Sequence, residues 1–306
     1  MHLDAVSSAN NRGKLEEAER LHRDVLNHQR EVLGEMHPDT LISSGNLASC
    51  LRAQGKLEEA ERLYRDVLNH QREVLGEMHP DTFTSSSNLA ACLHAQGKLE
   101  EAELLHRDVL NRQREVLGEM HRDTLVSSGN LASCLHEQGK LEEAERLYRD
   151  VLHHEREVLG EMHPGTLTSS SDLAACLDDQ GRLEEAEPLH RDVLNRQREV
   201  LGEMHPGTLA SSNNLASCLQ GQGKLEEAER LHRDVLNRTR EVLGETHLDT
   251  LLSVENLAAT FAFSGRLREA SQLLKDARQK CRTSHGVGHP QSIRLSSRLA
   301  LKSLSE

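Results

Sequence analysis

Two amphipathic helical patterns alternate along the chain, and each pair of patterns occupies 42 residues. In the unit 37–78, the first pattern places small and apolar side chains on one helical face, at Leu41, Ser44, Leu47, Ala48 and Leu51. The second pattern forms a longer stripe, at Leu57, Ala60, Leu63, Tyr64, Val67, Leu68, Val74 and Leu75. No stretch shows the alternation typical of a β-strand, so the chain is predicted to be all-α.

The ends of both helices carry recognisable signals. Pro38 suits the first helical turn, where its missing N–H leaves no hydrogen bond unmade, and Asp39 adds a favourable negative charge there. Gly55 fits a left-handed cap that ends the first helix. The second helix is predicted over residues 56–75 and ends at Gly76. Because the connection between the two helices is so short, we expect them to pack antiparallel.

The unit repeats without a change of register. The histidine that begins the first helix recurs at His37, His79, His121, His163, His205, His247 and His289. The glycine before the second helix recurs at Gly13, Gly55, Gly97, Gly139, Gly181, Gly223 and Gly265. A fixed period of this size is typical of stacked repeats, whose neighbours bury a continuous core. We therefore expect a single array over residues 1–306 of about seven units, with a truncated first helix and a terminal capping helix over 290–304.

Five of the six cysteines follow the same period, at Cys50, Cys92, Cys134, Cys176 and Cys218. Thr260 replaces the next one, and Cys281 lies off the period and is expected to be exposed. Structural zinc sites commonly use cysteine pairs a few residues apart, and the sequence has no two cysteines so close. We therefore interpret the periodic cysteines as free thiols in the core of a protein from a reducing compartment, and expect no metal site.

Composition narrows the range of partners. The chain carries a formal net charge of −13, which argues against nucleic acid or an anionic membrane as the main partner. Residues 265–306 differ, since nine Lys or Arg face three Asp or Glu there, which is either a partner site or a solvated cap. No apolar stretch is long enough for a membrane span, and residues 1–19 lack the features of a signal peptide. These observations predict a cytoplasmic protein that does not insert into membranes.

Motifs of catalysis are missing. Gly55-Lys56 is followed by Leu57, so no phosphate-binding loop of the GxxxxGK[ST] type forms. His154-Glu155 does not begin an HExxH zinc-protease motif, because position 158 holds Val158 and not histidine. There is also no GxSxG nucleophile elbow. Besides the periodic histidines, four more share one position of the second helix: His22, His106, His190 and His232. Such repetition favours packing or solvation, and the chain is predicted to be no enzyme and to bind no cofactor.

The repeated residues resemble a known family. An Asn-Leu-Ala element, a glycine eight residues after that leucine, and Leu-Glu-Glu-Ala resemble a tetratricopeptide repeat. The 42-residue length and the linker LGEMHPDT are similar to the units of kinesin light chain, and to units of nephrocystin-3-like and fungal nucleotide-binding proteins. The stretch NNLASCLQGQGKLEEAE, residues 213–229, carries this likeness most clearly. The resemblance implies a right-handed superhelical solenoid of antiparallel helix pairs, whose first helices line a concave groove.

The family's groove residue, just before Leu-Ala, corresponds here to Asn46, Asn88, Asn130, Asp172, Asn214 and Asn256. A side-chain amide can donate to a peptide carbonyl and accept from a peptide N–H, so a row of amides suits an extended backbone. The alternative is that these residues only solvate an exposed helix face. Five residues after the leucine that follows, the next predicted groove position is not basic, since it holds Arg52, His94, His136, Asp178, Gln220 and Ala262.

The resemblance implies a non-catalytic scaffold or adaptor that binds a peptide or partner protein in its groove, as the cargo-binding region of kinesin light chain does. Motor or cytoskeletal proteins are the partners it suggests, with no nucleic acid among them. The alternative is the sensor region of a nucleotide-binding signalling protein whose NTPase domain lies outside this chain. One local exception to the pattern is Pro188, which is expected to weaken its second helix because it removes a helical hydrogen bond.

Overall fold

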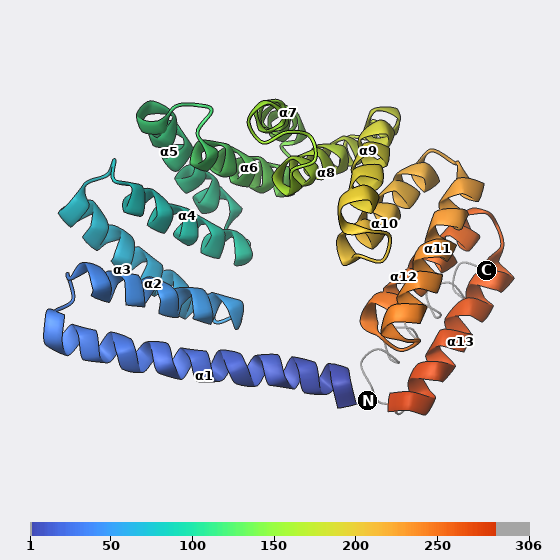
Figure 1. Cartoon of the computed structure of the whole chain (residues 1–306), viewed down its shortest axis with the longest axis horizontal. Helices are drawn as coiled ribbons and strands as arrows, with labels where there is room; N and C mark the ends of the chain where they lie inside the picture. Colours follow the sequence, from blue (N-terminus) through green and yellow to red (C-terminus); the bar gives the residue numbers. More distant parts are fainter. Residues whose placement is uncertain (1, 286–306) are drawn as a thin grey trace. The chain divides into compact units, whose positions relative to one another are not determined.

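A computed structural model describes residues 2–285, which form thirteen α-helices and no strand (Figure 1). The helices are α1 His2–Leu33, α2 Pro38–Ala53, α3 Leu57–Leu75, α4 Pro80–Ala95, α5 Leu99–Leu117, α6 Arg122–Glu137, α7 Leu141–Val158, α8 Pro164–Asp179, α9 Leu183–Leu201, α10 Pro206–Gly221, α11 Leu225–Leu243, α12 Leu248–Phe263 and α13 Leu267–His285. The all-α prediction is confirmed. The capping helix predicted over 290–304 lies outside the described residues. None of the described helices is long and apolar enough to cross a lipid bilayer.

The helices belong to two compact units, His2–Gly160 with α1 to α7 and the part of the chain from Glu161 with α8 to α13. Within each unit every helix packs against the next one along the chain. Only residues 54–56 separate α2 from α3, so the two helices of a pair run antiparallel. The first helices of the pairs are α2, α4 and α6 in one unit, and α8, α10 and α12 in the other.

Glycine ends both kinds of helix, as the sequence predicts. Gly55 has φ 77° and Gly76 has φ 87°, and both values lie in the left-handed region that favours glycine. The backbone N–H of Lys56 donates to the Leu51 carbonyl at 2.9 Å, which satisfies a carbonyl that the end of α2 would leave unpaired. The same turn recurs at each period, so the register of the array is encoded in these local caps.

Gly13 is an exception, and the sequence-based expectation at this point is wrong. The period predicts that Gly13 ends a truncated first helix, yet α1 runs without a break from His2 to Leu33. Gly13 is not among the glycines with positive φ. Glycine permits the left-handed turn but does not impose it, and a helix interior tolerates glycine at a cost of about 1 kcal/mol.

The periodic histidine has a role that the sequence pattern does not reveal. In α2 the Nδ1 atom of His37 accepts a hydrogen bond from the backbone N–H of Asp39 at 3.2 Å, so the histidine caps the helix N-terminus. The equivalent bond is present at five further first helices, where a backbone N–H donates to the Nδ1 atom of His79, His121, His163, His205 or His247. These histidines therefore serve the secondary structure of each unit.

The core is built from most positions of the predicted stripes, but Val74 and Leu75 at the end of the second stripe are exposed, so the prediction is wrong for these two residues. Leu47, Ala48 and Leu51 are each at most 2% exposed and pack with Ala60 and Tyr64 of the following helix. Very small side chains such as Ala48 and Ala60 let the helices approach closely. Burial of these stripes between successive helices supplies the hydrophobic stabilisation that no single pair can supply alone.

The cysteines lie in this core as free thiols. Cys50 is half-buried and the other periodic cysteines are buried. Cys281 is also buried, at 0% exposed, so the expectation that it is exposed is wrong. Its spacing explains the difference, because Leu274, Ala277 and Cys281 follow one another on the apolar stripe of α13 that packs against α12. Burial raises the pKa of Cys281, which keeps this thiol protonated.

Candidate functional site

The six predicted groove residues lie on one face of the first helices. Asn46, Asn88, Asn130, Asp172 and Asn214 are exposed and Asn256 is half-buried, and each precedes a buried Leu-Ala pair. We call the exposed side of the first helices that carries these residues the first-helix face. Their position on the surface of the first helices agrees with the sequence pattern, while their role in a binding groove stays a prediction.

A groove opens on the first-helix face of the unit His2–Gly160. It has a volume of about 560 Å³ and lies between α4 and α6, with the end of α5 at its margin. Asn88 and Asn130, one repeat apart, both line it. Phe83, Ala91 and Val126 add apolar surface. The groove therefore offers two amides above an apolar lining, which is the chemistry expected of a peptide site.

A smaller groove of about 320 Å³ opens in the second unit between α10 and α12. Asn213 lines this groove, and the predicted residue Asn214 is not among its lining residues. Leu209, Val235 and Leu252 give it a more apolar wall. Sequence reasoning missed Asn213 because the family motif points to the residue directly before Leu-Ala. The residue one step earlier also faces a groove at the equivalent position of α4, where Ser87 lines it beside Asn88.

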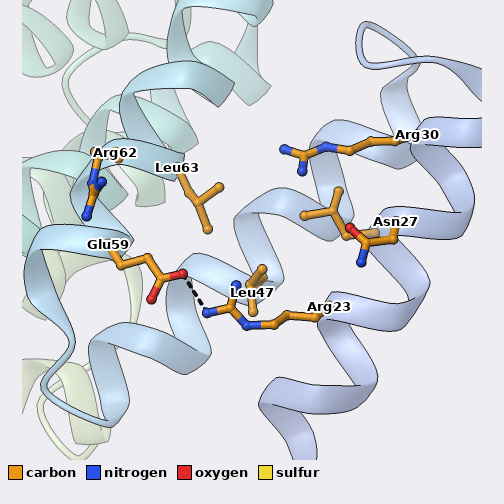
Figure 2. A pocket seen from close by; sticks show the side chains of 8 residues that line it. Arg23, Asn27, Arg30, Leu47, Glu59, Arg62 and Leu63 are labelled. Carbon is orange, nitrogen blue, oxygen red and sulfur yellow. Dashed lines mark hydrogen bonds and ion pairs between the residues drawn. The ribbon is translucent and has the colours of Figure 1, made fainter.

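The second helices form a different, charged surface. Figure 2 shows a hollow of about 280 Å³ where Arg23, Asn27 and Arg30 of α1 face Glu59 and Arg62 of α3. An equivalent hollow of about 390 Å³ lies between α9 and α11 in the second unit.

Carboxylates partner one arginine in each of these hollows. The Arg23 guanidinium lies 2.9 Å from Glu19 and 2.5 Å from Glu59, and Arg191 is likewise 2.8 Å from Glu187 and from Glu227. The pairs with Glu59 and Glu227 connect successive second helices. Arg23 and Arg191 therefore brace neighbouring repeats.

A polar layer lies inside the array where successive repeats meet. We call the three side chains at positions 52, 64 and 92, and those at 42-residue steps from them, a junction layer. The end of a first helix, the middle of the second helix and the next first helix each contribute one of the three. Four layers fall within one unit and lie wholly among residues whose side chains the structure describes: Arg52, Tyr64 and Cys92; His94, His106 and Cys134; Asp178, His190 and Cys218; and Gln220, His232 and Thr260.

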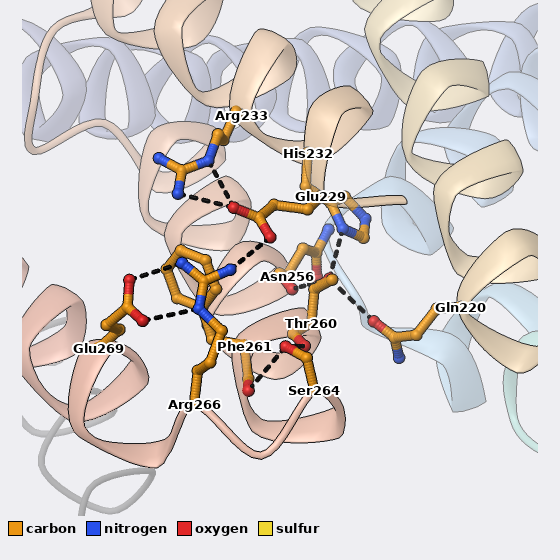
Figure 3. A network of polar contacts seen from close by, with 10 residues as sticks. All are labelled: Gln220, Glu229, His232, Arg233, Asn256, Thr260, Phe261, Ser264, Arg266 and Glu269. Atoms are coloured by element: carbon orange, nitrogen blue, oxygen red, sulfur yellow. Dashed lines mark hydrogen bonds and ion pairs between the residues drawn. The ribbon is translucent and has the colours of Figure 1, made fainter. Parts of the chain in front are cut away.

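Figure 3 shows the layer of Gln220, His232 and Thr260. The Thr260 hydroxyl lies 2.8 Å from His232 Nδ1 and 2.9 Å from the Gln220 side-chain oxygen, so neutral hydrogen bonds join all three residues. Burial lowers the pKa of His232 to about 4, which keeps the ring uncharged at neutral pH. Beside this layer, the Arg266 guanidinium lies 2.6 Å from both Glu229 and Glu269 and covers the ring of Phe261.

The layer of Asp178, His190 and Cys218 has a different character. His190 Nε2 lies 2.8 Å from Asp178 Oδ2, and one nitrogen, one oxygen and one sulfur of the trio all lie within 4.8 Å of one another. The His190 side chain is 3% exposed and that of Asp178 is 25% exposed, while Cys218 is buried. Burial, together with the adjacent Asp178 carboxylate, raises the pKa of Cys218 to about 12. Sequence reasoning missed this cluster because its members are 12 and 28 residues apart.

Comparison with known proteins identifies the repeat. A family model for the tetratricopeptide repeat matches in overlapping stretches, over residues 5–73, 44–115, 81–154, 123–199, 165–240 and 207–283. No sequence among the curated proteins matches the chain.

Solved structures share the fold. The nearly identical TPR-like repeats of a putative kinesin light chain from Podospora anserina are 31% identical, with a TM-score of 0.61 over 67% of this chain and 97% of that one. BtubC (BKLC) from P. vanneervenii is 21% identical, with a TM-score of 0.62 over 76% and 94% of the two chains. A signal-transduction ATPase with a tetratricopeptide repeat sensor from Pyrococcus horikoshii is 15% identical, with a TM-score of 0.67 over 89% of this chain and 40% of that one.

Proposed function

Since this chain belongs to the tetratricopeptide repeat family, we propose that it is a non-catalytic interaction scaffold that holds an extended peptide or partner segment along its first-helix face. The observation that supports this most directly is the groove between α4 and α6. Asn88 and Asn130 line it from successive repeats, and both side chains are exposed to solvent. Repeat arrays characteristically bind partners on such extended surfaces.

The chemistry of this groove favours a peptide over a small charged ligand. Each asparagine amide can donate to one backbone carbonyl and accept from one backbone N–H, which recognises an extended chain whatever its sequence. Val126, which is 52% exposed, then provides apolar contact for a side chain of the peptide. The exposed charges of the array are largely paired on the second helices, so they contribute little to selecting a partner.

The test uses peptides selected on the purified protein from a displayed random library, with affinity measured by calorimetry. Changing both Asn88 and Asn130 to Ala should lower affinity about tenfold, because each hydrogen bond is worth about 0.5–1.5 kcal/mol net. The matched control changes Asn69 and Asn111 to Ala, since these exposed asparagines lie on the second helices α3 and α5. Equal affinity of the groove variant and the parent protein, with unchanged circular dichroism, would show that the amides do not hold the peptide.

Within this class we favour an adaptor of the kinesin light chain type. The repeats of the putative kinesin light chain from Podospora are 31% identical to this chain, whereas the signal-transduction ATPase is 15% identical. The likeness to the signal-transduction ATPase supports the fold alone. Co-purification of the chain with a motor subunit would support the adaptor. Recovery of an NTPase domain in the same polypeptide would favour the sensor alternative, as would its recovery in a stable complex.

A further inference from the structure

We propose that Asp178, His190 and Cys218 form a binding site for a single divalent transition-metal ion of the zinc class. One carboxylate oxygen, one imidazole nitrogen and one thiol sulfur converge inside the second unit. Oxygen, nitrogen and thiolate sulfur are the donor types that Zn²⁺ accepts in proteins. Among the described residues, this is the one group of His, Cys and acidic side chains whose ligand atoms converge to this degree.

Three successive helices hold the ligands in place. Asp178 lies at the end of α8, His190 in the middle of α9 and Cys218 near the end of α10. All potential ligand atoms lie within 4.8 Å of one another. In a tetrahedral zinc site with bonds of about 2.0–2.3 Å, ligand atoms are separated by roughly 3.3–3.8 Å. The trio therefore needs only small side-chain rotations, chiefly an opening of the 2.8 Å contact between His190 Nε2 and Asp178 Oδ2.

The protein groups alone leave this layer incompletely satisfied. Asp178 Oδ1 is buried and has no hydrogen-bond partner. A buried carboxylate oxygen without a partner is costly, and a metal ion would offset that cost. The layer one repeat further is filled without charge, because Gln220, His232 and Thr260 are joined by hydrogen bonds between neutral groups. Its buried atom without a partner is a ring nitrogen of an uncharged histidine, His232 Nε2, and not a carboxylate oxygen.

The other junction layers do not form an equivalent site. His94, His106 and Cys134 include the right residue types, but His94 Nε2 lies 3.0 Å from Glu137 and the three ligand atoms do not converge. The layer of Arg52, Tyr64 and Cys92 has a cation in place of an acidic ligand. The trio at Asp178 is thus a specific departure from the repeat, and it supplies three protein ligands with a fourth position for water.

Two further features shape how such a site would work. The partly exposed Asp178 side chain gives the ion a route from solvent, whereas His190 and Cys218 are buried. Cys218 would bind the ion as a thiolate, so its proton would be released when the metal binds. A bound ion would tie α8, α9 and α10 together across two repeats.

The test is a titration of the full chain, stripped of metal by chelator, with Co²⁺ as a spectroscopic probe and Zn²⁺ as its competitor. We expect one equivalent of Co²⁺ to produce a thiolate-to-cobalt charge-transfer band, and Zn²⁺ to displace it and raise the melting temperature. The double variant D178Q/C218T copies the neutral layer at Gln220 and Thr260, so it is expected to fold. It should lose the band, with affinity reduced roughly hundredfold or more.

The matched control is C134T, which removes a cysteine at the equivalent position of another layer. It should keep the band and the affinity of the parent protein. Absence of the charge-transfer band in the parent protein would overturn the proposal, and so would its persistence in a folded D178Q/C218T protein. Equal loss in C134T and in D178Q/C218T would also overturn it, because binding would then not depend on this trio. The peptide-binding test above is independent of all these outcomes.

Discussion

The Nδ1 atom of His121 accepts a hydrogen bond from the backbone N–H of Asp123 at 3.2 Å, and this contact caps α6. The same relationship recurs at the other described first helices, which explains why the linker histidine keeps its 42-residue period. In α6, Arg122 replaces the proline found at the first position of α2. Arginine does not fix the backbone φ angle as proline does, so the start of α6 depends more on the histidine cap.

Changing His121 to Ala should therefore lower the free energy of unfolding by about 1 kcal/mol, the usual cost of removing an N-cap side chain. Changing His121 to Asn should preserve most of the stability, because asparagine is a strong N-cap residue. Urea unfolding followed by circular dichroism would measure both. If the alanine and asparagine variants unfold at the same urea concentration as the parent protein, the hydrogen bond contributes nothing.

Acid should weaken the array through its buried histidines. Burial, and secondarily the nearby His94, lowers the pKa of His106 from 6.5 to about 4. Between pH 6.5 and about pH 4, His106 therefore binds a proton in the unfolded chain but not in the folded chain. The stabilisation is fully present above pH 6.5 and is lost as pH falls toward 4, by up to about 1.4 kcal/mol per pH unit for one histidine.

H106Y should flatten this dependence, because tyrosine does not titrate in the range and occupies the same position at Tyr64 and Tyr148. Urea unfolding at pH 7 and pH 5 would give the comparison. The control is H153Y, at an exposed site, which should retain the pH dependence of the parent protein. A parallel drop in stability for the parent and H106Y proteins would contradict the role of this histidine.

Pro188 lies inside α9 and is exposed. The proline cannot donate the hydrogen bond that a helix interior expects, so α9 is predicted to be the weakest of the second helices. P188R should stabilise the chain by up to about 3 kcal/mol, since arginine is a good helix former and meets no steric barrier at an exposed site.

The matched change in the opposite direction is R230P, at the equivalent position of α11, and it should destabilise the chain by a similar amount. Thermal unfolding of both variants would measure the effect. A P188R protein that melts no higher than the parent would show that tertiary packing already compensates for the proline.

Thiol titration should count six cysteines per chain in denaturant with chelator and without reductant, because the structure contains six free thiols. In the folded protein the same reagent should react slowly. Burial raises the pKa of Cys92 and Cys134, so little reactive thiolate forms. A count of four or fewer in denaturant would indicate disulfides and remove the inference of a reducing compartment.

Local patterns in the sequence determined the helices, their caps and their pairing. The spacing of Leu47, Ala48 and Leu51 defines one buried face, and the glycines Gly55 and Gly76 end the helices at left-handed turns. Such features depend on residues within a few positions of one another. For that reason the sequence also indicates that Asn88 and Asn130 lie on the surface of the first helices.

The tertiary structure decided what depends on the packing of several helices. It carried α1 through Gly13 and placed Asn213, and not Asn214, among the residues that line a groove. Above all, it brought Asp178, His190 and Cys218 together from three helices. No local spacing reveals this meeting, because the distance between those side chains is set by how the helices cross and not by their separation along the chain.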